Sequence, residues 1–297
     1  MKKLCLATCI TLAAAALTAA PATVTAVIKD MPIYQSQNYS IRKGCSISNQ
    51  HGQYTFTLVR TKALGKAKPD TQLRMNAGTW GFSPQVRFFN LVINGIAGQK
   101  LVVKPEDIKA YRDGENAGAD ILFNYDGTKI CLRFYMRPDS PVLWGAIMPL
   151  PDSVEPIKSA YLEISLTASQ LVLSKERKAI FKDVYSRQVI TPVRTIDQNK
   201  NMIRLKPEDT RLVFQDTIYD GSGPDKGQGP CVVIVDHSQV EVANLRLTNF
   251  YASVVSLKLK PDFKEFRFGL FQQNARISNS DFAKRLAAEA DKFDFKK

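Results

Sequence analysis

The stretch ILFNYDGTKICLRFY, residues 121–135, decides the fold class of this chain. Two runs rich in β-branched and aromatic residues, 121–125 and 130–135, flank Asp126-Gly127. An Asp-Gly pair supplies the positive backbone angles of a tight hairpin turn, so these runs are predicted to be paired antiparallel strands. Similar period-two alternation recurs at 54–59, 86–93 and 161–166.

Many half-buried strands must each hide one face against another sheet, so the sequence predicts a mainly β protein. We expect a large antiparallel β-sandwich of two packed sheets with a C-terminal α-helix. The helix is placed at 280–293, where Ser278 and Asp281 resemble a capping box. The segments 240–247, 253–259 and 265–271 alternate with short links and are predicted to form an antiparallel meander.

The best internal boundary lies at Met148 to Pro156, where three prolines suit an extended connection. It divides the chain into an N-terminal β-rich half, 27–150, and a C-terminal β-rich half, 151–297, which ends in the helix. The link is short and retains apolar residues, which favours one continuous sandwich over two small domains. We find no internal repeat.

Residues 1–26 have the organisation of a cleavable signal peptide. The basic pair Lys2-Lys3 precedes an apolar stretch at 4–17, which is shorter than the roughly 20 residues that span a bilayer. We therefore expect an extracytoplasmic protein, periplasmic or secreted, that is soluble, has no transmembrane anchor and begins near Val27. Small-residue cleavage patterns end at Ala20, Ala22 and Ala26.

Cysteine usage excludes a redox or zinc motif. Cys45, Cys131 and Cys231 remain after removal of the signal peptide and lie more than 80 positions apart. An oxidising compartment would permit one disulfide with one leftover thiol. Their strand-like positions favour the alternative, three free and buried thiols.

The chain is basic, with a formal net charge of +13. In residues 31–104, ten Lys and Arg residues are opposed only by Asp70. Such a field attracts anionic polymers, although a solvated face that maintains solubility is the favoured interpretation. Nucleic acid is excluded as a partner because no helix-turn-helix, zinc or RNA-recognition signature is present. The candidate anion-binding side chains in this stretch are Arg60, Lys62, Lys66 and Lys68.

Histidine is scarce, which limits acid–base and metal chemistry. Only His51 and His237 occur, and no HExxH or HxH spacing exists. Asp236-His237-Ser238 does not form a relay, because neighbours along a strand point to opposite faces. We predict structural histidines, no metal site and no cofactor.

Two loops carry carboxylates. The loop 219–230 contains four glycines and two prolines but no following helix, so it is not a phosphate loop. It is either a binding loop with Asp220 and Asp225 at its ends or, as we favour, a long connection. In 111–120, the carboxylates are interpreted as solvated turn charges rather than a calcium site or a glycosidase pair.

Aromatic residues near turns offer a further indication of ligand binding, because exposed rings can stack on apolar ligand faces. Trp144, which lies between apolar neighbours, is assigned to the core instead. The candidate ligand-binding aromatics are Trp80, Tyr111 and Tyr219.

No motif identifies a reaction. The leading hypothesis is an exported, non-catalytic binding or accessory protein whose ligand is a carbohydrate, with an acidic glycan as one candidate. The first alternative is a carbohydrate-active enzyme that uses carboxylates or a His/Arg/Tyr site. The second is a structural component of cell-envelope assembly. The sequence leaves the oligomeric state and the ligand open.

Overall fold

The structure is a computed structural model of the chain. Its architecture is described for the following residues: 23–30, 39–61, 71–76, 89–98, 101, 103–166, 187–197, 201–222, 229–247, 253–273 and 275–295. No helix within these ranges is both long and apolar enough to cross a membrane.

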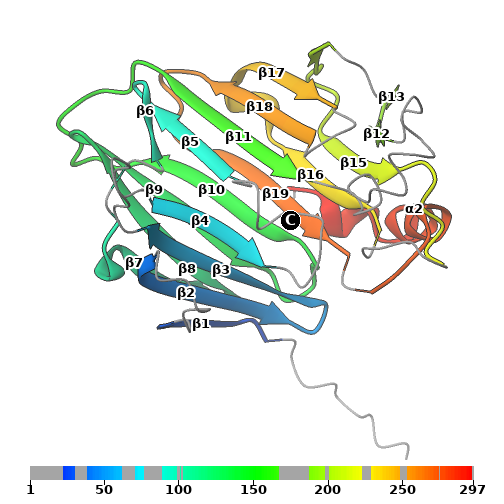
Figure 1. The fold of residues 1–297 in the computed structure, drawn as a ribbon, viewed down its shortest axis with the longest axis horizontal. Helices are drawn as coiled ribbons and strands as arrows, with labels where there is room; N and C mark the ends of the chain where they lie inside the picture. The colour runs from blue at the N-terminus through cyan, green and yellow to red at the C-terminus, as the bar shows by residue number, and fades with distance from the viewer. Residues whose placement is uncertain are drawn as a thin grey trace, which may run out of the picture.

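The described strands form three antiparallel sheets (Figure 1). The four-stranded sheet has the order β1-β2-β3-β4, with β1 at Thr25–Asp30, β2 at Tyr39–Asn49, β3 at Gly52–Thr61 and β4 at Thr71–Asn76. The six-stranded sheet has the order β14-β17-β18-β11-β5-β6, with β5 at Phe89–Ile93, β6 at Ile96–Ala97, β11 at Ala160–Leu166, β14 at Ile203–Arg204, β17 at Val240–Arg246 and β18 at Ser253–Leu259.

The third sheet is the largest and has nine strands in the order β13-β12-β15-β16-β19-β10-β9-β8-β7. It consists of β7 (Ile108–Asp113), β8 (Asn116–Tyr125), β9 (Thr128–Met136), β10 (Leu143–Pro149), β12 (Arg187–Ile190), β13 (Thr195–Asp197), β15 (Arg211–Asp216), β16 (Cys231–Val235) and β19 (Phe266–Gln272).

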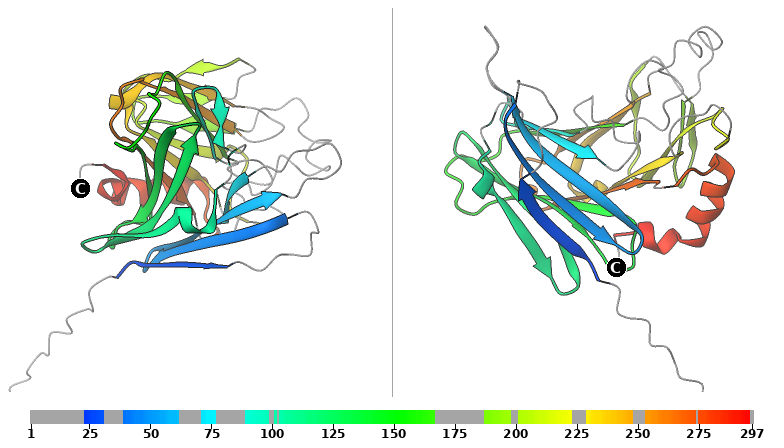
Figure 2. Two further views of the ribbon diagram at one scale, coloured as in Figure 1. Left: turned by 90° about the vertical axis from the view of Figure 1, so that its left-hand side faces the viewer. Right: turned by 60° about the horizontal axis from the view of Figure 1, so that its bottom comes forward.

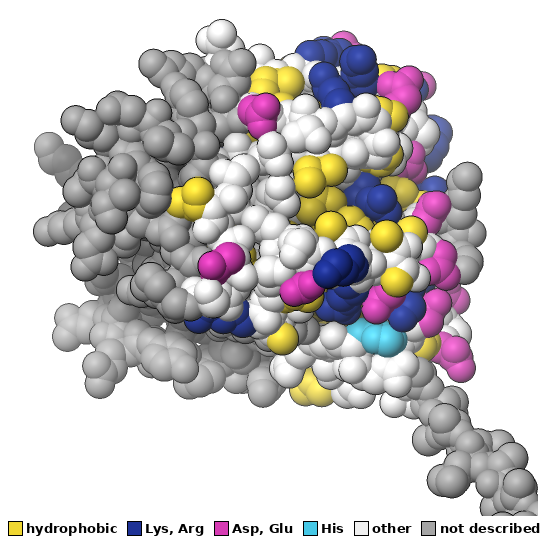
Figure 3. Space-filling view, turned by 90° about the vertical axis from the view of Figure 1, so that its right-hand side faces the viewer, with side chains coloured by type: hydrophobic (Ala, Val, Ile, Leu, Met, Phe, Trp, Pro, Cys, Tyr) yellow, Lys and Arg dark blue, Asp and Glu magenta, His cyan; other side chains and the backbone are white. Residues whose placement is uncertain are grey.

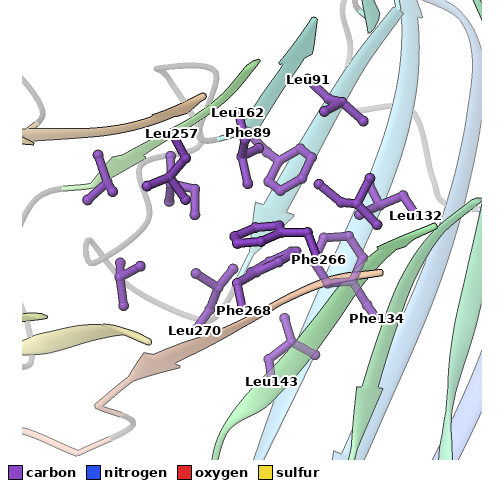
Figure 4. Packing of buried hydrophobic residues seen from close by; sticks show 14 of the residues in the cluster. Phe89, Leu91, Leu132, Phe134, Leu143, Leu162, Leu257, Phe266, Phe268 and Leu270 are labelled. Carbon is purple, nitrogen blue, oxygen red and sulfur yellow. The ribbon is translucent and has the colours of Figure 1, made fainter. Parts of the chain in front are cut away.

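Both smaller sheets pack against one face of the nine-stranded sheet, which we call its inner face. Phe56 of the four-stranded sheet stacks on Phe134, with ring centroids 4.4 Å apart. Phe89 of the six-stranded sheet lies 5.6 Å from Phe268, and Figure 4 shows this part of the core. The sandwich predicted from the sequence is therefore confirmed, with its second layer divided into two sheets.

The outer face of the nine-stranded sheet carries helix α2, Asn279–Ala288, on the side opposite the smaller sheets (Figure 2). Ser278 caps the helix by accepting a hydrogen bond from the Asp281 amide at 3.1 Å. Phe282 is buried and stacks on Phe271, with ring centroids 5.7 Å apart. The C-terminal helix and its cap agree with the prediction. A short 3₁₀ helix, η5, follows at Ala290–Phe293.

The predicted hairpin is present, whereas the predicted meander is wrong in its last strand. Asp126 and Gly127 have φ values of 52° and 94° and join β8 to β9. Strands β17 and β18 pair as expected, but β19 pairs with β10 and β16 in the other layer. Both faces of β19 are apolar, since Phe268 points inward and Phe271 outward. A strand with two apolar faces is buried on both sides, here between the main core of the sandwich and the smaller core under α2.

The N-terminal strand begins inside the segment expected to be a signal peptide. Thr25 and Ala26 pair with Ser48 and Ile47 of β2, and Val24 is 3% exposed within the main core. A cut after Ala26 would remove these residues from the fold. The cleavage patterns that end at positions 20 and 22 would leave β1 whole.

The main core joins residues of both predicted halves. It includes Ile130 from the N-terminal half and Leu257 from the C-terminal half. Cys45, Cys131 and Cys231 are free and buried, as the sequence predicts. Trp144 is 2% exposed, in agreement with its assignment to a core.

Candidate functional site

Several residues named from the sequence lie outside the part of the chain that the structure describes. Arg60 lies in β3, and only its backbone is described. The remaining basic candidates and two residues of the predicted ligand contacts fall in undescribed segments: Lys62, Lys66, Lys68, Trp80 and Asp225. The binding role suggested for these residues therefore stays a prediction.

The described part of the glycine-rich loop does not present its aromatic ring. Tyr219 is 3% exposed, so the ring belongs to the interior and not to a stacking surface. Asp220 is exposed and accepts hydrogen bonds from the amide and hydroxyl of Ser222, at 2.8 and 2.9 Å. This carboxylate closes a local turn.

Tyr111 belongs to a cluster on the outer face of β7, β8 and β9. The Arg133 guanidinium lies 3.7 Å from the centroid of the half-buried Tyr111 ring, and Tyr135 lies 5.8 Å from it. Arg133 in turn donates two hydrogen bonds to Asp120, at 2.7 and 2.8 Å. Burial raises the pKa of Tyr111, so the hydroxyl stays protonated. Asp120 is committed to an ion pair, and is not one of the solvated charges that the sequence predicts.

A cavity of about 520 Å³ lies between the sheet and the C-terminal segment. This volume is within the range of about 300–1,000 Å³ that is typical of small-molecule sites. Its first wall comes from strands β15, β16 and β19, and its second from the chain around η5. The three strands and the residues next to them provide Thr210, Arg211, Ile234, Val235, Asp236 and Arg267, and the C-terminal segment provides Ala290, Phe293, Asp294 and Phe295.

Charged side chains of both signs converge on this cavity. Arg267 donates from Nη2 to Oδ2 of Asp236 at 3.4 Å, and its side chain keeps 46% of its surface exposed. Burial lowers the pKa of Arg211, and the nearby negative charge of Asp294 opposes that shift. A guanidinium remains charged even so. The cavity thus offers donors and acceptors in adjacent positions.

His237 lies at the edge of the cavity, on the short helix η4, His237–Gln239. Its Nε2 donates to the carbonyl oxygen of Asp209 at 3.2 Å, because a carbonyl oxygen can only accept. Burial lowers the pKa of the imidazole below its ordinary value of 6.5, although nearby acidic groups partly counter the shift. The ring is therefore neutral at pH 7 and leaves Nδ1 as an acceptor.

The carbonyl that orients His237 belongs to a well-anchored residue. Asp209 is fully buried and forms an ion pair with Arg194, with 2.5 Å between Oδ2 and Nη2. It also accepts a hydrogen bond from the Lys206 amide at 2.8 Å. Burial acts to raise the pKa of this carboxyl, but the hydrogen bonds from Arg194 and Lys206 outweigh it and leave the pKa lowered.

Aromatic rings form the second wall and hold it against the sheet. Phe295 lies 5.1 Å from Trp144, and the Arg267 guanidinium lies 5.5 Å from the Phe295 ring. Arg137, which directly follows β9, donates to the carbonyl oxygen of Asp294 at 3.0 Å and so connects this segment to the end of that strand. The wall is therefore held by packing and by hydrogen bonds.

On the side of α2, the described part of the surface carries charged side chains of both signs. Figure 3 shows Lys and Arg side chains interspersed with Asp and Glu side chains, with hydrophobic side chains between them. Within the described ranges, no group of three or more His, Cys, Asp or Glu side chains is placed to hold a metal ion. The lining of the cavity contains hydrogen-bonding side chains and aromatic rings.

Sequence reasoning considered Asp236 and His237 only as a relay. In the structure, Asp236 accepts a hydrogen bond from the Ser238 amide at 3.0 Å and so caps η4. No sequence motif surrounds Arg267 or Asp294, and these residues lie 31 and 58 positions beyond Asp236 in the sequence. Only the pairing of β16 with β19 and the return of the C-terminal segment bring them together.

No family model and no curated protein matches the sequence. Among solved structures, the ligand-free α-N-acetylgalactosaminidase NagBb from Bifidobacterium bifidum aligns with a TM-score of 0.47 and 7% identity, over 90% of this chain and 37% of that one. The GH36 α-galactosidase AgaB from Geobacillus stearothermophilus aligns with a TM-score of 0.37 and 9% identity, over 78% of this chain and 40% of that one. The chain thus spans well under half the length of these carbohydrate-active enzymes, and the similarity is too distant to carry a functional argument.

Proposed function

We propose that this chain is an exported, non-catalytic carbohydrate-binding protein and that its ligand occupies the cavity beside η5. The observation that carries the proposal is the placement of Arg267, which contacts a carboxylate, Asp236, and an aromatic ring, Phe295, at one cavity wall.

A sugar matches this combination of groups. Each sugar hydroxyl can donate and accept a hydrogen bond. The adjacent Arg267 side chain supplies the complementary donor, and the Asp236 side chain supplies the acceptor. Hydrogen bonds to charged groups are stronger than those between neutral groups. The apolar C–H face of a sugar ring suits the half-buried ring of Phe295, which lines the same cavity.

Binding is favoured over hydrolysis because the Asp236 carboxylate and Nε2 of His237 already have partners. Asp236 caps η4 and pairs with Arg267, while His237 Nε2 is committed to the Asp209 carbonyl. A glycosidase needs two carboxyl groups that face each other across the scissile bond. These contacts make Asp236 an orienting group rather than a proton donor.

Export and the preference for an acidic glycan remain part of the proposal and are supported by the sequence. The signal-like segment 1–26 supports export, and the excess of basic residues in 31–104 supports attraction of anionic polymers. The cavity has both acidic and basic side chains and therefore suits a sugar with or without a carboxylate.

The experiment is a glycan array probed with the exported protein, with neutral, sulfated and uronate glycans side by side. We expect saturable binding to a restricted set of glycans and no release of reducing ends from those glycans. Binding to none of them would contradict the proposal. Hydrolysis of a bound glycan would instead identify the enzyme alternative.

A further inference from the structure

A second surface with ligand-binding chemistry lies on the outer face of the six-stranded sheet. A shallow groove of about 290 Å³ crosses strands β5, β11, β18 and β17. Tyr161 lies in the groove with 43% of its surface exposed. It is the only aromatic ring among the large hydrophobic residues that are exposed in the described ranges.

The strand register places Val92 on one side of this ring and Lys258 on the other. Tyr161 pairs with Val92 on β5 and with Lys258 on β18, and Lys258 pairs with Val242 on β17. Directly paired residues point to the same side of a sheet, so these four side chains form one row. The alternate residue Leu162 points into the core. The ring therefore lies between the apolar side chain of Val92 and the long side chain of Lys258, and Val242 lies beyond Lys258 in the same row.

A second row, made of polar side chains, runs parallel to the first. Glu163 pairs with Asn90 on one side and with Ser256 on the other, and Ser256 pairs with Asn244. Asn90 donates to Glu163 at 3.4 Å, and its buried Oδ1 has no hydrogen-bond partner in the described structure. Two amides, a hydroxyl and a carboxylate thus border the ring.

We propose that this surface, the Tyr161 row together with the Glu163 row, is a second glycan-binding site that takes neutral oligosaccharides. The chemistry selects the ligand: an apolar ring face contacts Tyr161, and uncharged hydroxyls contact the amides and the carboxylate. Lys258 is paired with Glu241 at 2.8 Å, so its charge is already matched. An acidic sugar would instead meet the carboxylate of Glu163, which forms no ion pair with another residue of the described ranges.

A protein partner fits the surface less well. Protein interfaces bury about 800 Å² on each side, with a core enriched in aromatic and other large apolar residues. Here a single exposed ring is bordered by amide and hydroxyl groups. Four neighbouring strands, spaced about 4.8 Å apart, instead present a narrow track across the sheet.

The two proposed sites lie on opposite sides of the sandwich. The cavity is on the outer face of the nine-stranded sheet, and the Tyr161 groove is on the outer face of the six-stranded sheet. The inner faces of these sheets pack together, so the two sites point away from each other. One molecule could then contact two glycan chains, which raises avidity for a polysaccharide matrix. This inference rests on the proposed function for one point, that the class of ligand is a glycan.

The test is affinity electrophoresis through gels that contain hydroxyethyl cellulose, xylan or laminarin as neutral probes. We expect at least one polysaccharide to retard the parent, Tyr161→Ala to weaken its binding about tenfold, and Tyr161→Phe to retain it because the ring remains. Glu163→Ala is a second variant at an exposed position and should also weaken binding. Arg112→Ala, at an exposed position on β7 that lines neither proposed site, should leave this retardation unchanged.

Each other result overturns the inference. Equal retardation of Tyr161→Ala and the parent would exclude the groove, and the cavity could still be assessed through Arg267→Ala. A parent that none of the three polysaccharides retards would also contradict it. If sedimentation showed a dimer that Tyr161→Ala dissociates, the occupant would be a second copy of the chain rather than a glycan.

Discussion

The carbonyl oxygen of Asp209 accepts a hydrogen bond from Nε2 of His237 at 3.2 Å, and this contact sets the tautomer of the histidine in the cavity. A fully buried carboxylate that is paired with Arg194 anchors the residue that provides the carbonyl. The cavity edge is therefore built on a rigid element, which is what a binding site needs to hold a ligand without reorganisation.

The low pKa of His237 predicts that acid destabilises the protein. The pKa of 6.5 expected in the unfolded chain exceeds that of the folded protein, so the unfolded state takes up the proton first as the pH falls. The free energy of unfolding should therefore decrease as the pH is lowered below about 6.5. His237→Gln should show a smaller decrease. Urea unfolding of the parent and of His237→Gln at pH 7.5 and pH 5.5 measures this decrease in each protein. An equal decrease in both would show that the pKa of His237 is not lowered by folding.

Loss of the Arg194 side chain should be strongly destabilising. Arg194→Met would leave the fully buried carboxylate of Asp209 without its cation, which costs about 3–5 kcal/mol when a buried pair is broken. The matched control is Lys284→Ala, because the pair of Lys284 with Asp281 is exposed on both sides. That change should cost no more than about 1 kcal/mol. Equal losses of unfolding free energy in the two variants would show that the buried pair stabilises the fold no more than the exposed pair does.

If the chain is exported as we propose, strand β1 predicts where the mature protein begins. Val24 is buried, and Thr25 pairs with Ser48, so a chain that starts at Val27 lacks part of the first strand. A protein that starts at residue 23 should be more stable by about 1.5–3 kcal/mol, the value for burial of one large aliphatic side chain. Chemical unfolding of the two proteins measures this. Intact-mass analysis of exported material should find cleavage after Ala20 or Ala22, and cleavage after Ala26 would contradict the expectation.

The cysteines should be unreactive in the folded protein. Burial raises the pKa of both Cys45 and Cys131 to about 12, and it also raises that of Cys231. A thiol reagent at pH 8 should therefore label the native protein slowly and should titrate three thiols in the exported, denatured and unreduced protein. Detection of a single thiol after denaturation would reveal a disulfide.

Local signals explain what the sequence could predict. The hairpin follows from the positive φ that Asp126 and Gly127 adopt, and the helix start follows from the side chain of Ser278. Both depend on residues within a few positions of each other. The placement of β19 could not be read in this way, because strand alternation does not specify which layer receives the next strand.

The candidate site was even less accessible to sequence reasoning. Tyr219 has the loop context of an exposed ring, yet it is buried. Tyr161 lies in an alternating run that predicts a strand, and nothing local distinguishes its exposed face as a binding surface. Arg267, Asp236 and Phe295 come from three separate segments, so only the tertiary fold brings them to one cavity.

The measurement that tests the central claim most directly is isothermal titration of the strongest glycan from the array into the parent, Arg267→Ala and Arg112→Ala. Arg112 is an exposed arginine on β7 and serves as a charge-matched control. We predict that Arg267→Ala weakens binding about tenfold or more, since hydrogen bonds to a charged group are lost. Arg112→Ala should bind within about twofold of the parent, because an isolated surface charge contributes little. Equal affinity of Arg267→Ala and the parent for that glycan would contradict the assignment of the cavity as the carbohydrate site.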